Sequence, residues 1–320
     1  MDRMFRIGFL LALLALWGCK SKPESTAVVK AGSAKDAPEL DSDKGSQLVR
    51  ATERNVDQYY ELLRQGRTQQ SVALRQVVAR AVDDDWATFA AVANDEKRSI
   101  VRNMSVKCIS FASAKRVEAR ELLLGICANK PPKPPWLLAN AVLGIGNLLD
   151  RETDLTPVIS LCGHGDVEVR TNAATALLHL FRVKATPREL TPQYHAAIDR
   201  LVTILHDRTS VRGRRAAAWA LANLHHPALL DHLISALLDD DEQVQVGGLR
   251  GIEQLGDQRA LEPLLAYLRK GPTPEGASWA QKALVSIAVQ GGFTDKAAEL
   301  EELGANPKLW EKWFTARRSR

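Results

Sequence analysis

Apolar and small residues recur at helical spacing through the second half of the chain, in segments that resemble one another. Four segments place small residues and a following leucine or isoleucine at the same offsets: VRTNAATALLHL (169–180), GRRAAAWALANL (213–224), VQVGGLRGIEQL (244–255) and GASWAQKALVSI (276–287). A weaker copy is PWLLANAVLGIGNL (135–148). Neighbouring copies lie about 30 to 45 residues apart, a period typical of helical repeat proteins.

A shorter apolar segment precedes each of the four: LTPVISLC, IDRLVTILHD, ALLDHLISALLDD and RALEPLLAYLRK. Each unit is therefore predicted to be a hairpin of two helices. One hairpin cannot bury its own apolar stripe, so successive hairpins should stack through a shared core. The predicted fold class is all-α, an α-solenoid of stacked helical hairpins. Its core should contain Leu177, Leu180, Leu221, Leu224, Ile252, Leu255, Leu284 and Ile287.

The turns and helix starts resemble those of HEAT repeats, specifically the short kind first noted in phycobilisome lyases. In that family an Asp in the turn and a Val-Arg start of the second helix are typical, and the Asp and Arg form a hydrogen-bonded ladder along the stack. The resemblance implies the fold strongly and the function hardly at all. The matching pairs are Asp166 with Arg170 and, loosely, Asp207 with Arg214, whereas Asp241 faces Gln245, where the ladder would break.

These patterns divide the folded part of the chain into three expected regions. Residues 135–304 are expected to form HEAT-like repeats, and residues 48–134, which are amphipathic but lack the motif, degenerate N-terminal helical repeats. Residues 305–320 are predicted to be a capping helix with a basic tail, and contact with anionic lipid is the alternative. That last region carries an apolar stripe and then basic residues: Leu309, Trp310, Trp313, Phe314, Arg317, Arg318 and Arg320.

The beginning of the chain is typical of a secretory signal peptide. Arg3 and Arg6 precede an apolar run that ends at Gly18. The run is shorter than the roughly 20 residues that a membrane-spanning helix needs, so a permanent transmembrane helix is not expected. Residues 1–18 are therefore predicted to be a signal peptide.

The segment LWGC (16–19) resembles the lipobox of bacterial lipoproteins, although Trp17 stands where a small residue is usual. The resemblance implies that Cys19 becomes the lipidated N-terminus and that the chain is lipid-anchored in the cell envelope. Lys20, in place of the Asp of many inner-membrane lipoproteins, implies the outer membrane, facing the periplasm, in a Gram-negative host. An ordinary signal peptide followed by a chance Cys is the alternative.

Residues 19–47 should form a disordered linker after the lipidated Cys. The sequence from Lys20 is rich in Lys, Ser, Ala, Asp and Pro and has almost no large apolar residue. Such a segment cannot bury enough surface to offset the entropy of ordering it. We therefore expect a flexible tether between the anchor and the helical body.

Three further cysteines, Cys108, Cys127 and Cys162, lie in apolar helical patterns. They can be three buried thiols, or Cys108 and Cys127 can form a disulfide across two antiparallel helices. The disulfide requires facing Cα atoms about 5.5 Å apart. The sequence leaves both possibilities open.

Catalytic and metal-binding motifs are missing from the sequence. It has no GxSxG elbow, Walker loop, HExxH or Gly-rich dinucleotide fingerprint. His225, His226 and His232 form the one local histidine cluster, which suits a surface turn better than zinc. The formal net charge of +5 is too small on this length to indicate nucleic acid. We therefore expect no enzyme activity, no cofactor and no nucleic-acid partner.

One face of the second helices is the predicted binding surface. Solenoids present a long concave surface, and Trp and Arg are the residue types that most often anchor interfaces. The alternative is that the two Trp pack between repeats. The partner-binding residues predicted are His179, Arg215, Trp219, Asn223, Arg250, Gln254, Trp279 and Lys282.

The function expected is that of a non-enzymatic scaffold that holds an unknown protein partner near the membrane. A monomer is expected. The second hypothesis is a binding module for an envelope polymer or anionic lipid, through Arg215, Arg250, Lys282 and the basic tail. Binding of that kind should weaken with salt, because exposed charges are screened.

Overall fold

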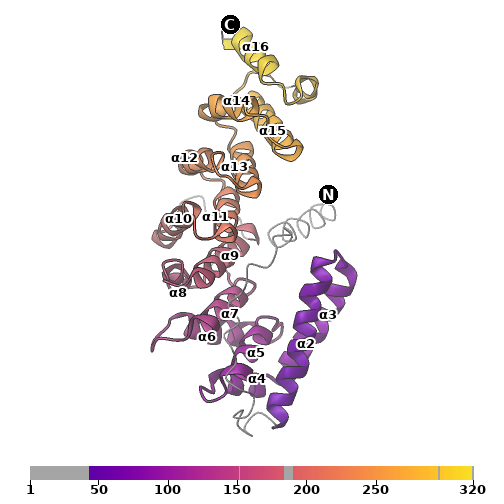
Figure 1. Cartoon of the computed structure of the whole chain (residues 1–320), viewed down its shortest axis with the longest axis vertical. Helices are drawn as coiled ribbons and strands as arrows, with labels where there is room; N and C mark the ends of the chain where they lie inside the picture. The colour runs from indigo at the N-terminus through magenta and orange to yellow at the C-terminus, as the bar shows by residue number, and fades with distance from the viewer. Residues whose placement is uncertain (1–42, 151, 184–189, 295, 319–320) are drawn as a thin grey trace. The chain divides into compact units, whose positions relative to one another are not determined.

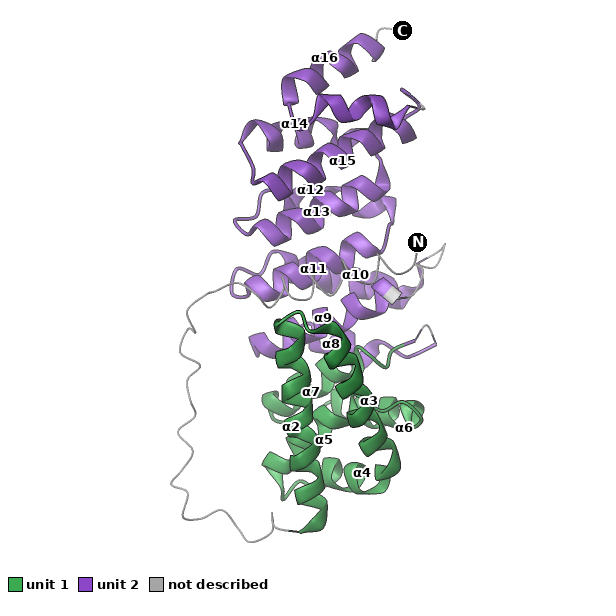
Figure 2. Cartoon of the chain, turned by 90° about the vertical axis from the view of Figure 1, so that its right-hand side faces the viewer, with its two compact units in different colours: residues 1–149 green, residues 150–320 purple. Residues whose placement is uncertain are grey.

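The structure is a computed structural model, and it describes residues 43–150, 152–183, 190–294 and 296–318. All regular elements in these ranges are helices, as the repeat pattern predicts (Figure 1). The contacts divide the chain into two compact units, residues 1–149 and 150–320 (Figure 2). The predicted signal peptide, Cys19 and most of the predicted linker lie outside the described residues.

Residues 43–149 of unit 1 form three helical hairpins. Helix α2 packs along α3, α4 along α5, and α6 along α7, while α5 also packs against α7. Helix α2 also packs on α5, the second helix of the next hairpin, more extensively than on α4, the first. The bounds are α2 (Lys44–Arg64), α3 (Thr68–Asp84), α4 (Trp86–Asn94), α5 (Ser99–Ile109), α6 (Arg116–Cys127) and α7 (Pro135–Ile145).

Helix α2 begins within the predicted linker. Asp43 caps it, because its Oδ1 accepts a hydrogen bond from the Ser46 amide at 2.8 Å, and it also pairs with Arg98 of the following hairpin. The Ser46 side chain is fully buried. A helix thus begins here in a polar segment that lacks an apolar pattern, because a side-chain cap and an ion pair with the next hairpin stabilise it.

Unit 2 stacks hairpins in the order that the sequence repeats predict. The second helices α9, α11, α13 and α15 pack each on the next, and the first helices lie on one side of them (Figure 1). Short 3₁₀ turns η2 (Pro227–Leu229) and η3 (Gln258–Ala260) lead into α12 and α14. The helices are α8 (Thr156–Leu161), α9 (Val167–Val183), α10 (Pro192–Leu205), α11 (Val211–Asn223), α12 (Leu230–Ala236), α13 (Glu242–Leu255), α14 (Leu261–Arg269) and α15 (Pro274–Gln290).

Small residues set the spacing between these helices. A Cβ on Gly248 would lie 2.7 Å from the Leu233 carbonyl oxygen, and one on Gly251 would lie 2.7 Å from the Leu233 methyl groups. The main-chain contact at Gly248 therefore requires glycine for helices α12 and α13 to pack this closely, whereas at Gly251 the Leu233 side chain would have to move. All the predicted core residues are buried except Leu255, which is partly exposed at the end of α13.

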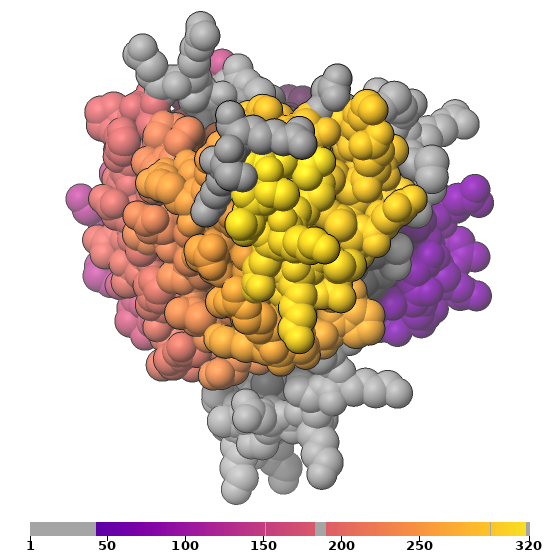
Figure 3. Space-filling model, turned by 90° about the horizontal axis from the view of Figure 1, so that it is seen from above, coloured from indigo at the N-terminus to yellow at the C-terminus, as the bar shows by residue number. Residues whose placement is uncertain are grey.

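The end of unit 2 is closed by η4 (Ala297–Leu303) and α16 (Pro307–Arg318), and α16 packs on α14. Trp310 is fully buried and Phe314 nearly so, and Trp310 stacks on Phe314 with ring centroids 5.8 Å apart. Seen from above, the yellow residues of α16 lie against the orange residues before them (Figure 3). Most of the apolar stripe thus faces the protein, as expected for a capping helix, although Leu309 is exposed.

Acidic residues near helix ends accept main-chain hydrogen bonds, and one of them binds a turn far along the chain. Asp241 accepts hydrogen bonds from the amides of Gln243 and Val244 at the start of α13. Asp83, near the end of α3, instead accepts from the amides of residues 113–115 ahead of α6, at 2.9 to 3.2 Å. The Asp83 carboxylate therefore joins two hairpins of unit 1.

Candidate interaction surface

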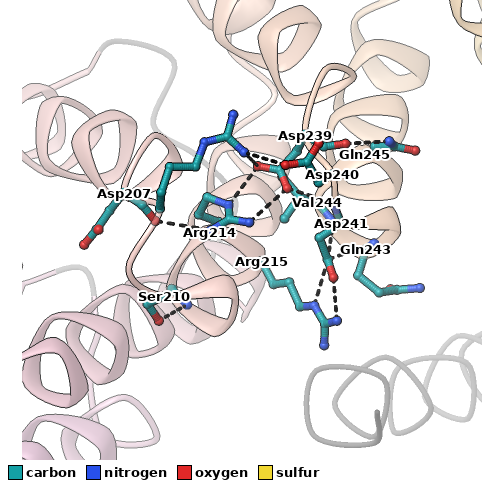
Figure 4. Close-up of polar contacts among 12 residues, drawn as sticks. Asp207, Ser210, Arg214, Arg215, Asp239, Asp240, Asp241, Gln243, Val244 and Gln245 are labelled. Carbon is teal, nitrogen blue, oxygen red and sulfur yellow. Dashed lines mark hydrogen bonds and ion pairs between the residues drawn. The ribbon is translucent and has the colours of Figure 1, made fainter. Parts of the chain in front are cut away.

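Ion pairs link successive hairpins of unit 2 along the turns before the second helices. Arg170 of α9 donates to the Asp207 carboxylate at 2.8 Å, and Asp207 belongs to the turn of the next hairpin. Arg214 of α11 holds Asp239 of the following turn through two hydrogen bonds of 2.8 and 3.2 Å (Figure 4). The Arg214–Asp239 pair is buried on both sides.

This ladder has a different register from the one that the sequence suggested. Asp166 accepts from the Val169 amide and so caps its own helix, while Arg170 reaches the next turn. Arg214 likewise binds the Asp239 carboxylate of the next turn. Its contact with Asp207 is a hydrogen bond to the main-chain oxygen, not to the carboxylate. An arginine side chain is long enough to span from one hairpin to the next, so the carboxylates join neighbours.

The ladder continues through neutral groups where the sequence suggested a break. Gln245 donates to the Asp239 carbonyl oxygen at 2.6 Å (Figure 4). It also accepts a hydrogen bond from the Tyr267 hydroxyl at 3.0 Å. An amide can both donate and accept, so Gln245 joins the Asp239 turn to the following hairpin without a charge. The sequence comparison of Asp with Arg alone could not show this.

Arg215 and Asn223 are not on a free surface, which corrects their assignment to partner binding. Arg215 is 7% exposed and makes a two-pronged ion pair with Asp241, at 2.8 and 2.7 Å (Figure 4). Asn223 is 8% exposed and donates to the Trp219 carbonyl oxygen at 2.8 Å. The sequence contains a signal for these pairs, because two adjacent arginines, Arg214 and Arg215, are followed in the next turn by acids at 239 and 241.

Trp219 and Arg250 lie together, as their shared offset in successive repeats suggested. The Arg250 guanidinium lies 5.1 Å from the centre of the Trp219 ring, joining α13 to α11. Trp219 is only 6% exposed, and its indole N–H donates to the Gln243 carbonyl oxygen at 3.2 Å. Trp219 therefore packs between repeats, whereas the partly exposed Arg250 covers it and faces outward.

The remaining predicted contacts lie on α9, α13 and α15. The Lys282 ammonium lies 4.2 Å from the centre of the Trp279 ring on the same helix, and Lys282 is exposed while Trp279 is partly exposed. His179 and Gln254 are also partly exposed. The buried Oε1 atom of Gln254 accepts no hydrogen bond from any described residue.

Three charged or titratable residues lie near Arg250, and the sequence pattern predicted none of them as its neighbour. Burial raises the pKa of Glu253, and Arg250 and Lys282 oppose that rise. Burial and the charge of Arg250 lower the pKa of His225. The same two causes lower the pKa of Arg182 to about 10. Arg250 is thus the centre of a mostly basic group, which only the stacking of α9, α11, α13 and α15 brings together.

The three cysteines of the described ranges are buried in the helical core. Cys108, Cys127 and Cys162 are free and buried, so the alternative of a Cys108–Cys127 disulfide is wrong for this structure. No three His, Cys, Asp or Glu side chains among the described residues are placed to hold a metal ion. No helix in those ranges is long and apolar enough to cross a membrane.

The fold and the ladder define an α-helical repeat protein, and comparisons with known proteins agree. Residues 198–285 match the family model of HEAT repeats. The chain is 34% identical over 86 residues to a HEAT repeat-containing taxis protein of Halobacterium salinarum, which is 26% of this chain and 20% of that protein. The chain therefore spans only about a fifth of that relative's length.

A solved structure supports the fold over most of the chain. The X-ray structure of the YibA protein of Escherichia coli resembles this one with a TM-score of 0.51 and 15% sequence identity. The similarity covers 87% of this chain and 98% of the other. At that identity it shows the fold alone. Residues 198–285 of unit 2 thus match HEAT repeats, and the described part of the chain is an α-solenoid of helical hairpins.

Proposed function

We propose that this protein is a non-enzymatic scaffold, anchored in the bacterial envelope through lipidated Cys19, that holds a protein partner on the second-helix face of unit 2. The observation that carries the proposal is the set of contacts among Trp219, Arg250, Trp279 and Lys282, here called the aromatic–cation row. It places two cations over two indole rings on neighbouring helices. Tryptophan and arginine contribute most to known protein interfaces.

Repeat architecture supports the scaffold part of the proposal. HEAT repeats are present, and stacked hairpins expose a long row of equivalent positions on which an extended partner can lie. The ladder of Arg170, Arg214 and Gln245 uses polar groups to hold the hairpins in register. A stiff array with a partly exposed basic row is suited to recognition.

Photo-crosslinking in cells tests the scaffold function. A photoreactive amino acid placed at Lys282 should give a discrete crosslinked product with one protein. The same residue at Glu262, exposed on the first helix α14, is the matched control and should not give that product. Identical products from both positions, or none from Lys282, would count against a partner on this face.

The anchor is tested separately, because it rests on the resemblance to the lipobox. Cells grown with an alkyne-labelled fatty acid should label the wild-type protein, and it should sediment with the membrane fraction. Cys19→Ser should lose both the label and the membrane association. A wild-type protein that stays unlabelled would remove the anchor and leave the scaffold function standing.

A further inference from the structure

Arg250 differs from the other arginines on the second helices described above. Arg170, Arg214 and Arg215 all form ion pairs with aspartates. Arg250 is partly buried against Trp219, yet it makes no hydrogen bond or ion pair with any residue in the described ranges. A guanidinium carries five N–H donors, and removing them from water without an acceptor is costly. Its arrangement is therefore suited to an anion from outside the chain.

Lys282 provides a second cation one helix further along. It sits over Trp279, and in the part of the chain that the structure describes it too forms no ion pair within 4 Å. Glu253 interacts electrostatically with both Arg250 and Lys282, which places the two cations on the same side of α13 and α15. Packed helices lie about 8 to 10 Å apart. Arg250 and Lys282 stand at the same offset in two successive repeat segments, so we infer a separation of that order between their charges.

The spacing matches an extended peptide. A strand-like segment advances about 3.3 Å per residue, so two carboxylates three residues apart are separated by roughly 10 Å. Carboxylates accept two parallel hydrogen bonds from a guanidinium, and the partly exposed Trp279 ring offers apolar contact to a neighbouring side chain of the segment. A ligand that combines carboxylates with apolar side chains at this spacing is an acidic protein segment.

An anionic membrane surface fits the same group less well. Sequence segments that bind acidic lipids carry clusters of about four to eight Lys and Arg. The aromatic–cation row has Arg250 and Lys282, with Glu253 beside both of them. An acid at the centre would weaken attachment to a uniformly negative surface, whereas discrete carboxylates can bind to either side of it.

We propose that Arg250 and Lys282 bind two carboxylates, about three residues apart, of an acidic extended segment in a partner protein. The proposal rests on the proposed function, because it names the kind of segment that the second-helix face would hold. The negative charge of Glu253 then weakens the binding of an acidic segment. Removing its charge should strengthen the binding that Arg250 and Lys282 provide.

Selection from a displayed library of random twelve-residue peptides on the full-length protein tests the proposal. Enriched peptides should share two Asp or Glu residues about three positions apart. For a selected peptide, Arg250→Gln should weaken binding about 10-fold or more, because a hydrogen-bonded charge is lost. Glu253→Gln should strengthen it. Arg259→Gln, which removes an exposed arginine paired with Asp257, is the control and should leave binding unchanged.

Three results would overturn the proposal. The first is enriched peptides without acidic residues, and the second is equal peptide binding by wild type and Arg250→Gln when both have the same thermal midpoint. The third is loss of binding to phosphatidylglycerol vesicles in Arg250→Gln with peptide binding intact, which would assign the row to a membrane. If a partner still crosslinks at position 282 in any of these cases, the scaffold function is supported and only the recognition of acidic segments is wrong.

Discussion

The Arg214 guanidinium binds both carboxylate oxygens of Asp239, which lies in the turn of the next hairpin, and both side chains are about 95% buried. Removing one partner leaves an uncompensated charge inside the stack, at a cost of about 3 to 5 kcal/mol. Arg214→Leu and Asp239→Leu should each lower the free energy of unfolding by about that amount, measured by urea denaturation. The double variant should recover a large part of the loss.

The control for this pair is Arg259→Ala, which breaks an exposed ion pair with Asp257 and should cost at most about 1 kcal/mol. Equal losses from Arg214→Leu and Arg259→Ala would mean that the buried pair contributes no more than a surface one. The comparison therefore measures what burial adds to one step of the ladder.

Asp207 should make the stability of unit 2 depend on pH in the acid range. The hydrogen bond from Thr209, opposed by burial and helped by Arg170, lowers the pKa of Asp207 to about 2. A folded-state pKa below the unfolded value contributes stability that is complete above about pH 4 and is lost as the pH falls through about 2. Asp207→Asn should remove about 2 kcal/mol at pH 6 and almost nothing at pH 2.

Thermal unfolding of wild type and Asp207→Asn between pH 2 and pH 6 measures this dependence. Asp240→Asn, which removes an exposed carboxylate in the next turn, is the control and should follow the wild-type curve. A difference between wild type and Asp207→Asn that stays constant over the whole range would contradict the assignment of the shift to Asp207.

Gly248 should be intolerant of even one methyl group. Alanine normally stabilises a helix interior relative to glycine by about 1 kcal/mol. At position 248 the new methyl would lie 2.7 Å from the Leu233 carbonyl oxygen and 2.9 Å from the Ala236 Cβ, so overpacking should cost about 1 to 3 kcal/mol. Gly125→Ala, on α6 with no atom within 4 Å of the new Cβ, should instead stabilise.

Denaturant midpoints of the two glycine variants give the comparison directly. The expected result is a shift in opposite directions from the wild-type midpoint. Stabilisation by Gly248→Ala would show that α12 and α13 are not held at the separation described here.

The cysteines should be unreactive until the protein unfolds. Burial raises the pKa of Cys127 and of Cys162 to about 12, and it also raises the pKa of Cys108. Only the thiolate is nucleophilic, so a disulfide-exchange reagent at pH 8 should modify none of the three in the native state and all three in denaturant. Reaction in the native state at the rate of a free thiol would contradict their burial.

The sequence alone determined that this protein is a stack of helical hairpins. The period of small and apolar residues is local information, and each copy repeats the same buried face, so the fold and seven of the eight core positions could be predicted. The offset that pairs Trp219 with Arg250 was also predictable, because equivalent positions of neighbouring repeats lie side by side.

Only the tertiary structure decided which charges are paired and which are free. Arg215 and Arg250 each precede a small residue on a second helix, yet Asp241 of the next turn neutralises the first and no described residue forms an ion pair with the second. The ion pair of Asp43 with Arg98 at the start of α2 and the hydrogen bonds of Asp83 to the turn before α6 are likewise contacts between distant segments. Such pairings depend on the distance between stacked helices to within about an ångström, and the pattern of residue types along one chain does not contain that distance.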